Sequence, residues 1–277
     1  MAYQAFDVTI EDHVAHLQLK RPEALNTMIP AFWSEIREIF EVLGNDASVR
    51  VAVLSSTGKH FTAGMDLSVF ASLAPTVAEE ARKRDELRRK ILALQDCFSI
   101  IERMRFPVLV AIQGGCIGGG VDMVSACDMR YATADAFFQI AEINIGMTAD
   151  VGTLQRLPKL MPEGMIRELA YTGQRLSAQR AREVGLVNEV FESHEAMIEG
   201  VLAIAREIAG HSPLAIAGTK EMLNYTRDHT VADGLNYIAT WNAGMLMGND
   251  MPTALAARMQ KQAPEYEDLT VLPAKLL

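Results

Sequence analysis

Length, composition and charge place the chain among ordinary globular proteins. It has 277 residues, of which 49% are hydrophobic and 22% charged, enough to bury a full core. A formal net charge of −9 argues against a nucleic-acid surface, because phosphates attract positive charge. The three cysteines, Cys97, Cys116 and Cys127, form no CxxC pair, which indicates a reducing compartment and no disulfide framework.

The N-terminal half alternates strands with helices. β-type runs at 5–10 and 14–20 predict a hairpin, and apolar residues at helical spacing predict a helix over 31–44 that stops at Gly44. The apolar runs 49–56 and 106–114 are typical of buried parallel strands. The further expected elements are a helix over 77–104, a helix starting near Gly119, and two short strands within 129–140. This alternation predicts an α/β fold.

After Asp150 the pattern becomes mostly helical. One short strand is expected within 185–191, and amphipathic helices are expected within 194–210, 212–228 and 231–248. We therefore divide the chain into an α/β core with the active site, residues 1–195, and a helical C-terminal region for oligomerisation, residues 196–277.

The ends of the sequence and its apolar runs carry no recognised targeting signal. The start, MAYQAFDVTIEDH, lacks the basic and apolar regions of a signal peptide, and no apolar run reaches the roughly 18 residues of a membrane span. The last residues, PAKLL, are one residue out of register with a Ser-Lys-Leu-type peroxisomal ending. We expect a cytoplasmic protein that contacts no membrane.

Two glycine-containing segments are candidates for ligand binding. Gly114, Gly115, Gly118, Gly119 and Gly120 fit neither G-x-G-x-x-G nor a P-loop. Glycines between a strand and a helix let a ligand approach the backbone, although tight strand–helix packing explains them equally well. The segment FTAGMDL, residues 61–67, has the same form, and two exposed amides from two such loops can make an oxyanion hole.

These segments, followed by CDMRYAT, AFFQIAEINIGM and GTLQRLPK, resemble the crotonase (enoyl-CoA hydratase/isomerase) superfamily over about residues 5–260. The resemblance implies the spiral ββα core of the ClpP/crotonase fold with a helical C-terminal region. It also implies a homotrimer or hexamer, an acyl-CoA thioester as substrate, and no metal or redox cofactor. The six histidines form no HxxxH or HExxH ligand pair, so a metal is not expected from the sequence either.

The resemblance assigns roles to backbone groups. In that family two N–H groups hold the thioester oxygen, and the matching positions here are Met65 and Gly119. The implied substrate-binding residues are Ala63, Gly64, Met65, Asp66, Leu67, Gly119 and, in the segment KRPEALN, Ala24.

Three carboxylates distinguish the chain within the family. Hydratases carry a glutamate after the glycine triplet, where this chain has Asp122, and a second one matched by Glu142. They carry no acid at the position of Asp150. The trio, with TADVGTLQRLPK, most resembles the Δ3,5-Δ2,4-dienoyl-CoA isomerases of fatty-acid β-oxidation.

The chemistry supplies an independent reason for the extra acid. Moving a 3,5-diene to a 2,4-diene removes a proton from C2 and adds one at C6, which is too far apart for one carboxylate to serve both carbons. We expect Glu142 to take the C2 proton, Asp150 to deliver the C6 proton, and Asp122 to orient the site.

Other interpretations remain open at this stage. Asp150 precedes a helical pattern and is a plausible N-cap, and Asp66 is a better cap than reactant. A hydratase would use Asp122 and Glu142 on water. A non-catalytic or RNA-binding homologue is disfavoured by the net charge. Cys116 is expected to be a buried thiol, and the charged run 81–90 a solvated helix face.

Overall fold

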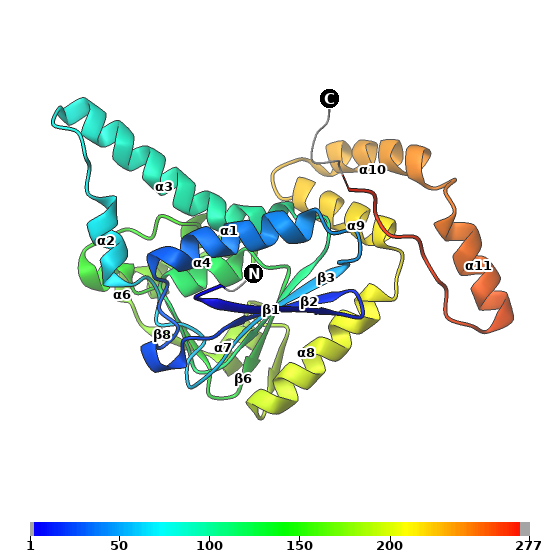
Figure 1. Cartoon of the computed structure of the whole chain (residues 1–277), viewed down its shortest axis with the longest axis horizontal. Coiled ribbons are helices and arrows are strands. Elements are labelled where there is room, and N and C mark those ends of the chain that lie inside the picture. The colour runs from blue at the N-terminus through cyan, green and yellow to red at the C-terminus, as the bar shows by residue number, and fades with distance from the viewer. Residues whose placement is uncertain (1–2, 272–277) are drawn as a thin grey trace.

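The computed structural model describes residues 3–271 and begins with the expected hairpin (Figure 1). Strands β1 (Phe6–Glu11) and β2 (Val14–Leu19) pair antiparallel, with Phe6 opposite Leu19. Asp12 and His13 make the turn with positive φ angles of 48° and 65°. The hairpin prediction is confirmed.

The hairpin forms one edge of a six-stranded sheet. The order is β1-β2-β3-β4-β6-β9, and every pair after the hairpin is parallel. The added strands are β3 (Val51–Ser56), β4 (Val108–Ile112), β6 (Met129–Thr133) and β9 (Glu189–Phe191). All residues of β3 and β4 are buried, which explains their continuous apolar runs.

Helices cover both faces of this sheet, with α1 and α3 above it and α8 below it in Figure 1. On one face α1 (Pro30–Gly44) and α3 (Glu80–Arg103) pack Phe32 and Phe98 against the core. On the other face α8 (His194–Ala209) packs its buried side chains against β3 and β4. The α/β class is confirmed.

A smaller sheet carries the candidate site. It has the order β5-β7-β8, with β5 (Gly115–Ile117), β7 (Phe137–Gln139) and β8 (Arg175–Ser177). The sequence pattern predicted neither β5, which lies within the glycine cluster, nor β8, in which Leu176 is the single apolar residue. β5 leads directly into α4 (Gly119–Ser125), so the expected helix start at Gly119 is confirmed.

Short elements connect these parts. They are α2 (Leu67–Leu73), α5 (Thr153–Arg156), α6 (Glu163–Thr172), α7 (Ala178–Glu183) and the 3-10 helices Pro22–Ala24, Glu142–Ile145 and Leu157–Lys159. The run 81–90 lies in α3 and is mostly exposed, as predicted.

Three further helices form an arm at the C-terminal side, drawn at the right of Figure 1. They are α9 (Pro213–Tyr225), α10 (Val231–Met245) and α11 (Asp250–Gln260). The division at residue 195 stays a prediction. Helix α8 spans that boundary and packs on the sheet, so the arm itself follows Ala209. The PAKLL ending lies outside the described residues. Within 3–271 no helix has the length and apolar character needed to cross a membrane.

Candidate active site

Two backbone segments meet at the edge of the small sheet. Thr62 forms a parallel bridge with Cys116, in which the Thr62 N–H donates to Gly115 O at 3.0 Å and the Ile117 N–H donates to Thr62 O at 3.2 Å. This pairing brings the FTAGMDL loop beside the turn before α4. A Cβ atom placed on Gly64, whose φ is 91°, would lie 2.8 Å from Ile117 O and 3.7 Å from the Gly119 nitrogen. The close approach to Ile117 O and the positive φ therefore require glycine there.

The amides at the two expected positions are available. Gly119 is the first residue of α4, so its N–H has no partner within the helix. Met65 bridges Met28, but that bridge uses Gly64 O and the Asp66 N–H. Among residues 3–271 neither the Met65 nor the Gly119 N–H donates to another protein atom. Two unpaired donors side by side are the arrangement an oxyanion hole requires.

The two amides border a pocket of about 200 Å³. Of the expected substrate-binding residues, Ala63, Gly64, Met65, Leu67 and Gly119 line it. The remaining lining residues are Phe70, Ile117, Gly118, Asp122, Ala141, Glu142, Ile145, Met147, Asp150 and Val151. The three acids expected to be catalytic therefore share one largely apolar cavity.

Two of the expected substrate-binding residues are not part of this lining. Asp66 is the N-cap of α2, and its carboxylate accepts hydrogen bonds from the Ser68 N–H at 2.9 Å and from the Thr27 hydroxyl at 3.2 Å. The hydrogen bonds from Ser68 hold its pKa below the usual range, so the cap interpretation is confirmed. Ala24 ends the 3-10 helix Pro22–Ala24, one residue before the Leu25 carbonyl that accepts the Ala63 N–H at 3.0 Å.

Glu142 lies against the turn before α4. A Cβ atom on Gly118 would sit 3.2 Å from Glu142 Oε1, and Gly118 has a φ of 53°. Glu142 Oε2 is buried and, within the described part of the chain, accepts no hydrogen bond. Burial, and then the neighbouring charge of Asp122, raises the pKa of Glu142 to about 7. An unpaired basic oxygen in an apolar pocket is suited to removing a carbon-bound proton.

Asp122 is buried in the first turn of α4, only 1% exposed. Its Oδ1 accepts the Thr153 N–H at 2.6 Å, which ties α4 to the start of α5. Burial raises the pKa of Asp122 to about 6, although the hydrogen bonds from Thr153 oppose the shift. One of its oxygens is thus committed to a backbone amide, which suits an orienting role.

Asp150 does not cap the helix that follows it. The N-cap of α5 is Gly152, with a φ of 136°, and the Thr153 N–H is bound by Asp122. The N-cap alternative for Asp150 is therefore wrong, because a distant side chain already satisfies that amide. The half-buried Asp150 lines the pocket, and burial raises its pKa.

The apolar lining residues Phe70, Ile145, Met147 and Val151 were not predicted from the sequence. Ile145 and Met147 follow Glu142 closely in EINIGM, and this proximity was the available signal. Phe70 reaches the pocket only because α2 folds over it, and no sequence pattern indicates that.

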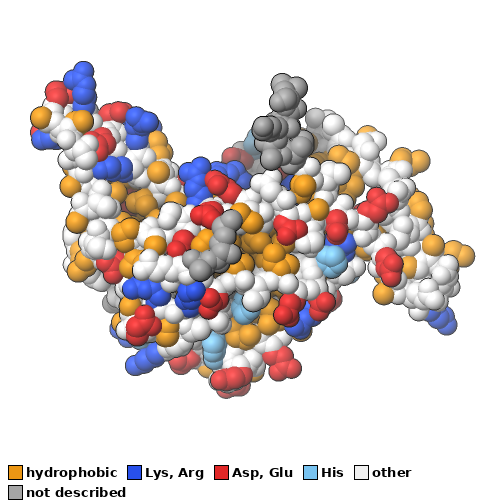
Figure 2. All heavy atoms as spheres, in the orientation of Figure 1, with side chains coloured by type: hydrophobic (Ala, Val, Ile, Leu, Met, Phe, Trp, Pro, Cys, Tyr) orange, Lys and Arg blue, Asp and Glu red, His pale blue; other side chains and the backbone are white. Residues whose placement is uncertain are grey.

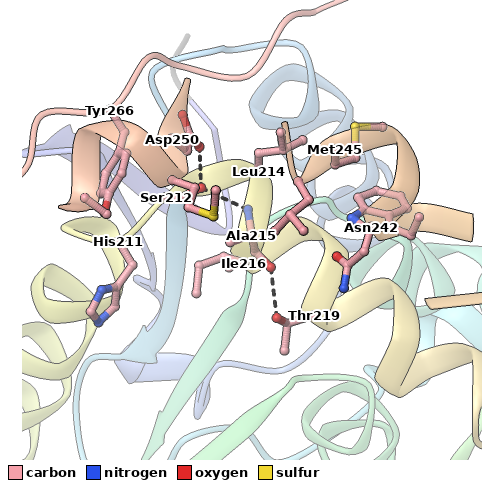
Figure 3. Close-up of a pocket in the computed structure, with 14 residues that line it drawn as sticks. His211, Ser212, Leu214, Ala215, Ile216, Thr219, Asn242, Met245, Asp250 and Tyr266 are labelled. Atoms are coloured by element: carbon pink, nitrogen blue, oxygen red, sulfur yellow. Dashed lines mark hydrogen bonds between the residues drawn. The ribbon is translucent and has the colours of Figure 1, made fainter. Parts of the chain in front are cut away.

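Other candidate sites do not contain reactive pairs. Cys116 is fully buried, and burial raises the pKa of its thiol well above the usual value, which confirms the prediction of an inert thiol. A separate pocket at the start of α9, of about 430 Å³, contains His211, Ser212 and Asp250 (Figure 3). There the Ser212 hydroxyl donates to Asp250 and accepts the Ala215 N–H at 3.0 Å, while His211 points away (Figure 3). Ser212 is therefore a helix cap.

Two relatives match nearly the whole chain. The Delta(3,5)-Delta(2,4)-dienoyl-CoA isomerase, mitochondrial, of Mus musculus is 45% identical over 264 residues, which cover 94% of this chain and 81% of the relative. The Delta(3,5)-Delta(2,4)-dienoyl-CoA isomerase, peroxisomal, of Arabidopsis thaliana is 42% identical over 262 residues and covers 94% of both chains.

These relatives contradict the expected cytoplasmic location. One is a mitochondrial protein and the other a peroxisomal one. The expectation rested on missing signals for secretion and membrane insertion, and the lack of those signals does not distinguish the cytoplasm from an organelle.

The solved structures and the family model agree with the fold described above. The crystal structure of an enoyl-CoA hydratase from Bacillus anthracis superimposes with a TM-score of 0.86 at 30% identity, covering 95% of this chain and 99% of that one. The expected crotonase fold is thus confirmed. The model of the enoyl-CoA hydratase/isomerase family matches residues 9–268. With the converging amides and the shared acidic pocket, these similarities show that the chain belongs to the enoyl-CoA hydratase/isomerase family.

Proposed function

We propose that the protein is an isomerase that converts 3,5-dienoyl-CoA into 2,4-dienoyl-CoA during fatty-acid β-oxidation. The observation that carries this proposal is the meeting of Asp122, Glu142 and Asp150 in one apolar pocket beside two unpaired amides. The Mus musculus and Arabidopsis thaliana relatives are named for this activity.

The two amides stabilise the charge that develops on the thioester oxygen. Loss of the C2 proton converts the substrate into a dienolate whose negative charge resides largely on that oxygen. The Met65 and Gly119 N–H groups donate to it, and each such donor contributes roughly 3 kcal/mol to the transition state. The apolar side chains of Leu67, Phe70 and Met147 surround the acyl chain and keep water away from the dienolate.

The reaction needs one of the two carboxyl groups of Glu142 and Asp150 to be protonated and the other to be ionised. Ionised Glu142 accepts the C2 proton, and protonated Asp150 donates a proton to C6. The step leaves Glu142 protonated and Asp150 ionised, so one proton passes from Glu142 back to Asp150, directly or through solvent, before the next turnover. Because burial raises the pKa of Glu142 to about 7, the pair of Glu142 and Asp150 still holds one proton near neutral pH. Asp122 holds the Thr153 amide and raises the pKa of Glu142 through its charge. Because only protons move, the reaction requires neither a metal nor a redox cofactor.

A comparison of two substrates tests this proposal. Purified protein is offered 3,5-octadienoyl-CoA and crotonyl-CoA separately, and ultraviolet spectra follow the gain of the 2,4-diene and the loss of the 2-enoyl group. We expect isomerisation to be much faster than hydration. Hydration at an equal or higher rate would reject the isomerase and favour the enoyl-CoA hydratase, with Asp122 and Glu142 acting on water.

We further propose that the arm of α9–α11 joins copies of the chain into a homotrimer or hexamer. Large apolar side chains are exposed along it, including Leu235 at 64%, Met247 at 86%, Leu255 at 55% and Met259 at 87%. Figure 2 shows hydrophobic side chains at the surface of this arm, at the right of the view. A patch of this kind on a folded chain is characteristic of a protein interface. Light scattering should give three or six chain masses, and Leu235→Glu with Leu255→Glu should release smaller species. A monomeric unaltered protein would refute the assembly.

A further inference from the structure

The loop that carries Asp150 separates two cavities. Val151 lines the pocket of about 200 Å³ on one side and a second cavity of about 440 Å³ on the other. Residues 148–152 contain no helix or strand. Residues 148–151 make no backbone–backbone hydrogen bond within the described part of the chain and have space on both sides, so the loop depends on side chains from other elements for its position.

Side chains from α3 and α5 hold the carbonyl groups of this loop. Gln95 Nε2 donates to Asp150 O at 2.6 Å, and Arg156 Nη1 donates to Val151 O at 3.3 Å. Neither Gln95 nor Arg156 lines the pocket of the three acids. They approach the loop from the second cavity, which both of them line.

Arg156 is itself fixed. Its Nε and Nη2 donate to Glu102 Oε2 at 2.9 and 2.8 Å, and Nη2 also donates to Ser99 Oγ at 3.0 Å. The side chain is only 13% exposed. A Cβ atom on Gly152 would lie 1.7 Å from Arg156 Nη1, so the guanidinium occupies space that only glycine leaves free.

Glu102 links this cluster to the C-terminal arm. Its Oε1 pairs with Arg227, in the segment between α9 and α10, and its main-chain oxygen accepts Asn224 Nδ2 at 3.0 Å. Gln95, Ser99 and Glu102 follow one another at spacings of four and three residues, which places them on one face of α3. That face is a rigid support for the loop.

We propose that Gln95 and Arg156 are positioning residues for Asp150. Gln95 fixes the peptide group from which the Asp150 side chain projects toward C6 of the substrate, and Arg156 fixes the next peptide group. Neither touches a reacting atom. This inference rests on the proposed function, because it matters only if Asp150 transfers a proton.

The first test separates proton delivery at C6 from proton removal at C2. Gln95→Met keeps the side-chain length and suits a helix, but it removes the amide donor. We expect kcat for dienoyl-CoA isomerisation to fall about 10- to 100-fold with KM unchanged, since a misplacement of about 1 Å costs on the order of 10²-fold. Exchange of the C2 hydrogen with deuterated solvent, which depends on Glu142, should keep its rate. An equal loss of both rates would show that Gln95 supports the fold in general, and would overturn the proposal.

A double-mutant cycle tests whether Gln95 acts through Asp150. In an Asp150→Asn background, Gln95→Met should cause no further loss of isomerisation. Losses that multiply would mean that the two residues act independently, and the positioning role would be rejected. Full turnover by Asp150→Asn alone is a different outcome, because it would reject the proposed proton donor itself.

Two more variants complete the design. Gln155 lines the same second cavity, is exposed, and its side chain makes no hydrogen bond among residues 3–271, so Gln155→Met is the matched control and should behave like the unaltered protein. Arg156→Lys keeps the charge but loses the planar fork that reaches Val151 and Glu102 together. It should show the same split between isomerisation and exchange, and it carries the test if Gln95→Met does not fold. Unchanged kcat in both Gln95→Met and Arg156→Lys would refute the inference.

Discussion

The buried base Glu142 should make stability depend on pH in a predictable way, and Glu142→Gln should remove that dependence. Burial, and then the charge of Asp122, raises the pKa of Glu142 from 4.5 to about 7. The native state therefore holds a proton that the unfolded chain releases between about pH 4.5 and pH 7. The stabilising effect of this proton is complete at the acidic end of that window and is lost as the pH rises through it.

The size of the effect follows from the shift. At about 1.36 kcal/mol per pKa unit, Glu142 costs the native state at most about 2 to 3 kcal/mol more at pH 8 than at pH 5. Because Glu142 is only partly buried, solvent screening makes the measured value smaller than this limit. Glutamine has no proton to lose, so Glu142→Gln should gain stability relative to the unaltered protein as the pH increases.

Denaturant unfolding at pH 5 and pH 8 measures the effect of Glu142→Gln on the free energy of unfolding. The protein concentration is held fixed, because subunit association also contributes to that free energy. The quantity to compare is the difference in unfolding free energy between variant and unaltered protein at each pH. Glu168→Gln, at an exposed position on α6, is the control. Its difference in unfolding free energy from the unaltered protein should be the same at pH 5 and pH 8. A Glu142→Gln difference that does not change between pH 5 and pH 8 would refute the reasoning.

Three further predictions concern catalysis. Asp150→Asn should cost little stability, because Gly152 and not Asp150 is the N-cap. Isomerisation should drop about 10²-fold or more, while exchange of the C2 hydrogen persists through Glu142. Thermal unfolding, turnover and NMR-detected deuterium exchange measure these effects, and normal turnover would contradict the prediction. Gly119→Pro deletes one amide donor and should lower kcat by at least about 10²-fold, so a folded variant with near-normal kcat would reject the oxyanion hole. The pH profile of kcat/KM should be bell-shaped, because the reaction needs one proton shared by Glu142 and Asp150, and its alkaline limb should lie near pH 7, where the pair loses that proton. Asp122→Asn keeps an acceptor for the Thr153 N–H and removes a charge that raises the Glu142 pKa, so it should move this limb to lower pH, and an unmoved limb would contradict the coupling.

Local sequence patterns are enough to predict the features that depend on residues adjacent in the chain. The hairpin, the buried parallel strands and the helix start at Gly119 follow from local patterning and glycine placement, and the structure has all of them. The family resemblance also predicts Met65 and Gly119 as amide donors, and the structure leaves both of these N–H groups unpaired among residues 3–271. These positions are recognisable because a close backbone approach requires glycine at fixed places in the loops.

The way in which distant parts of the site meet depends on the packing of the folded chain. The exclusion of the cap at Asp150 depended on Asp122 reaching the Thr153 amide, and the main-chain oxygen of Asp150 is held by Gln95 from α3. The short strands β5 and β8, and the place of Phe70 in the pocket wall, likewise exist only through their partners. The sequence could not predict these contacts, because they join residues far apart in the chain. Their distances are set by how α3, α4 and the small sheet pack together, and periodicity along the sequence contains no information about that packing.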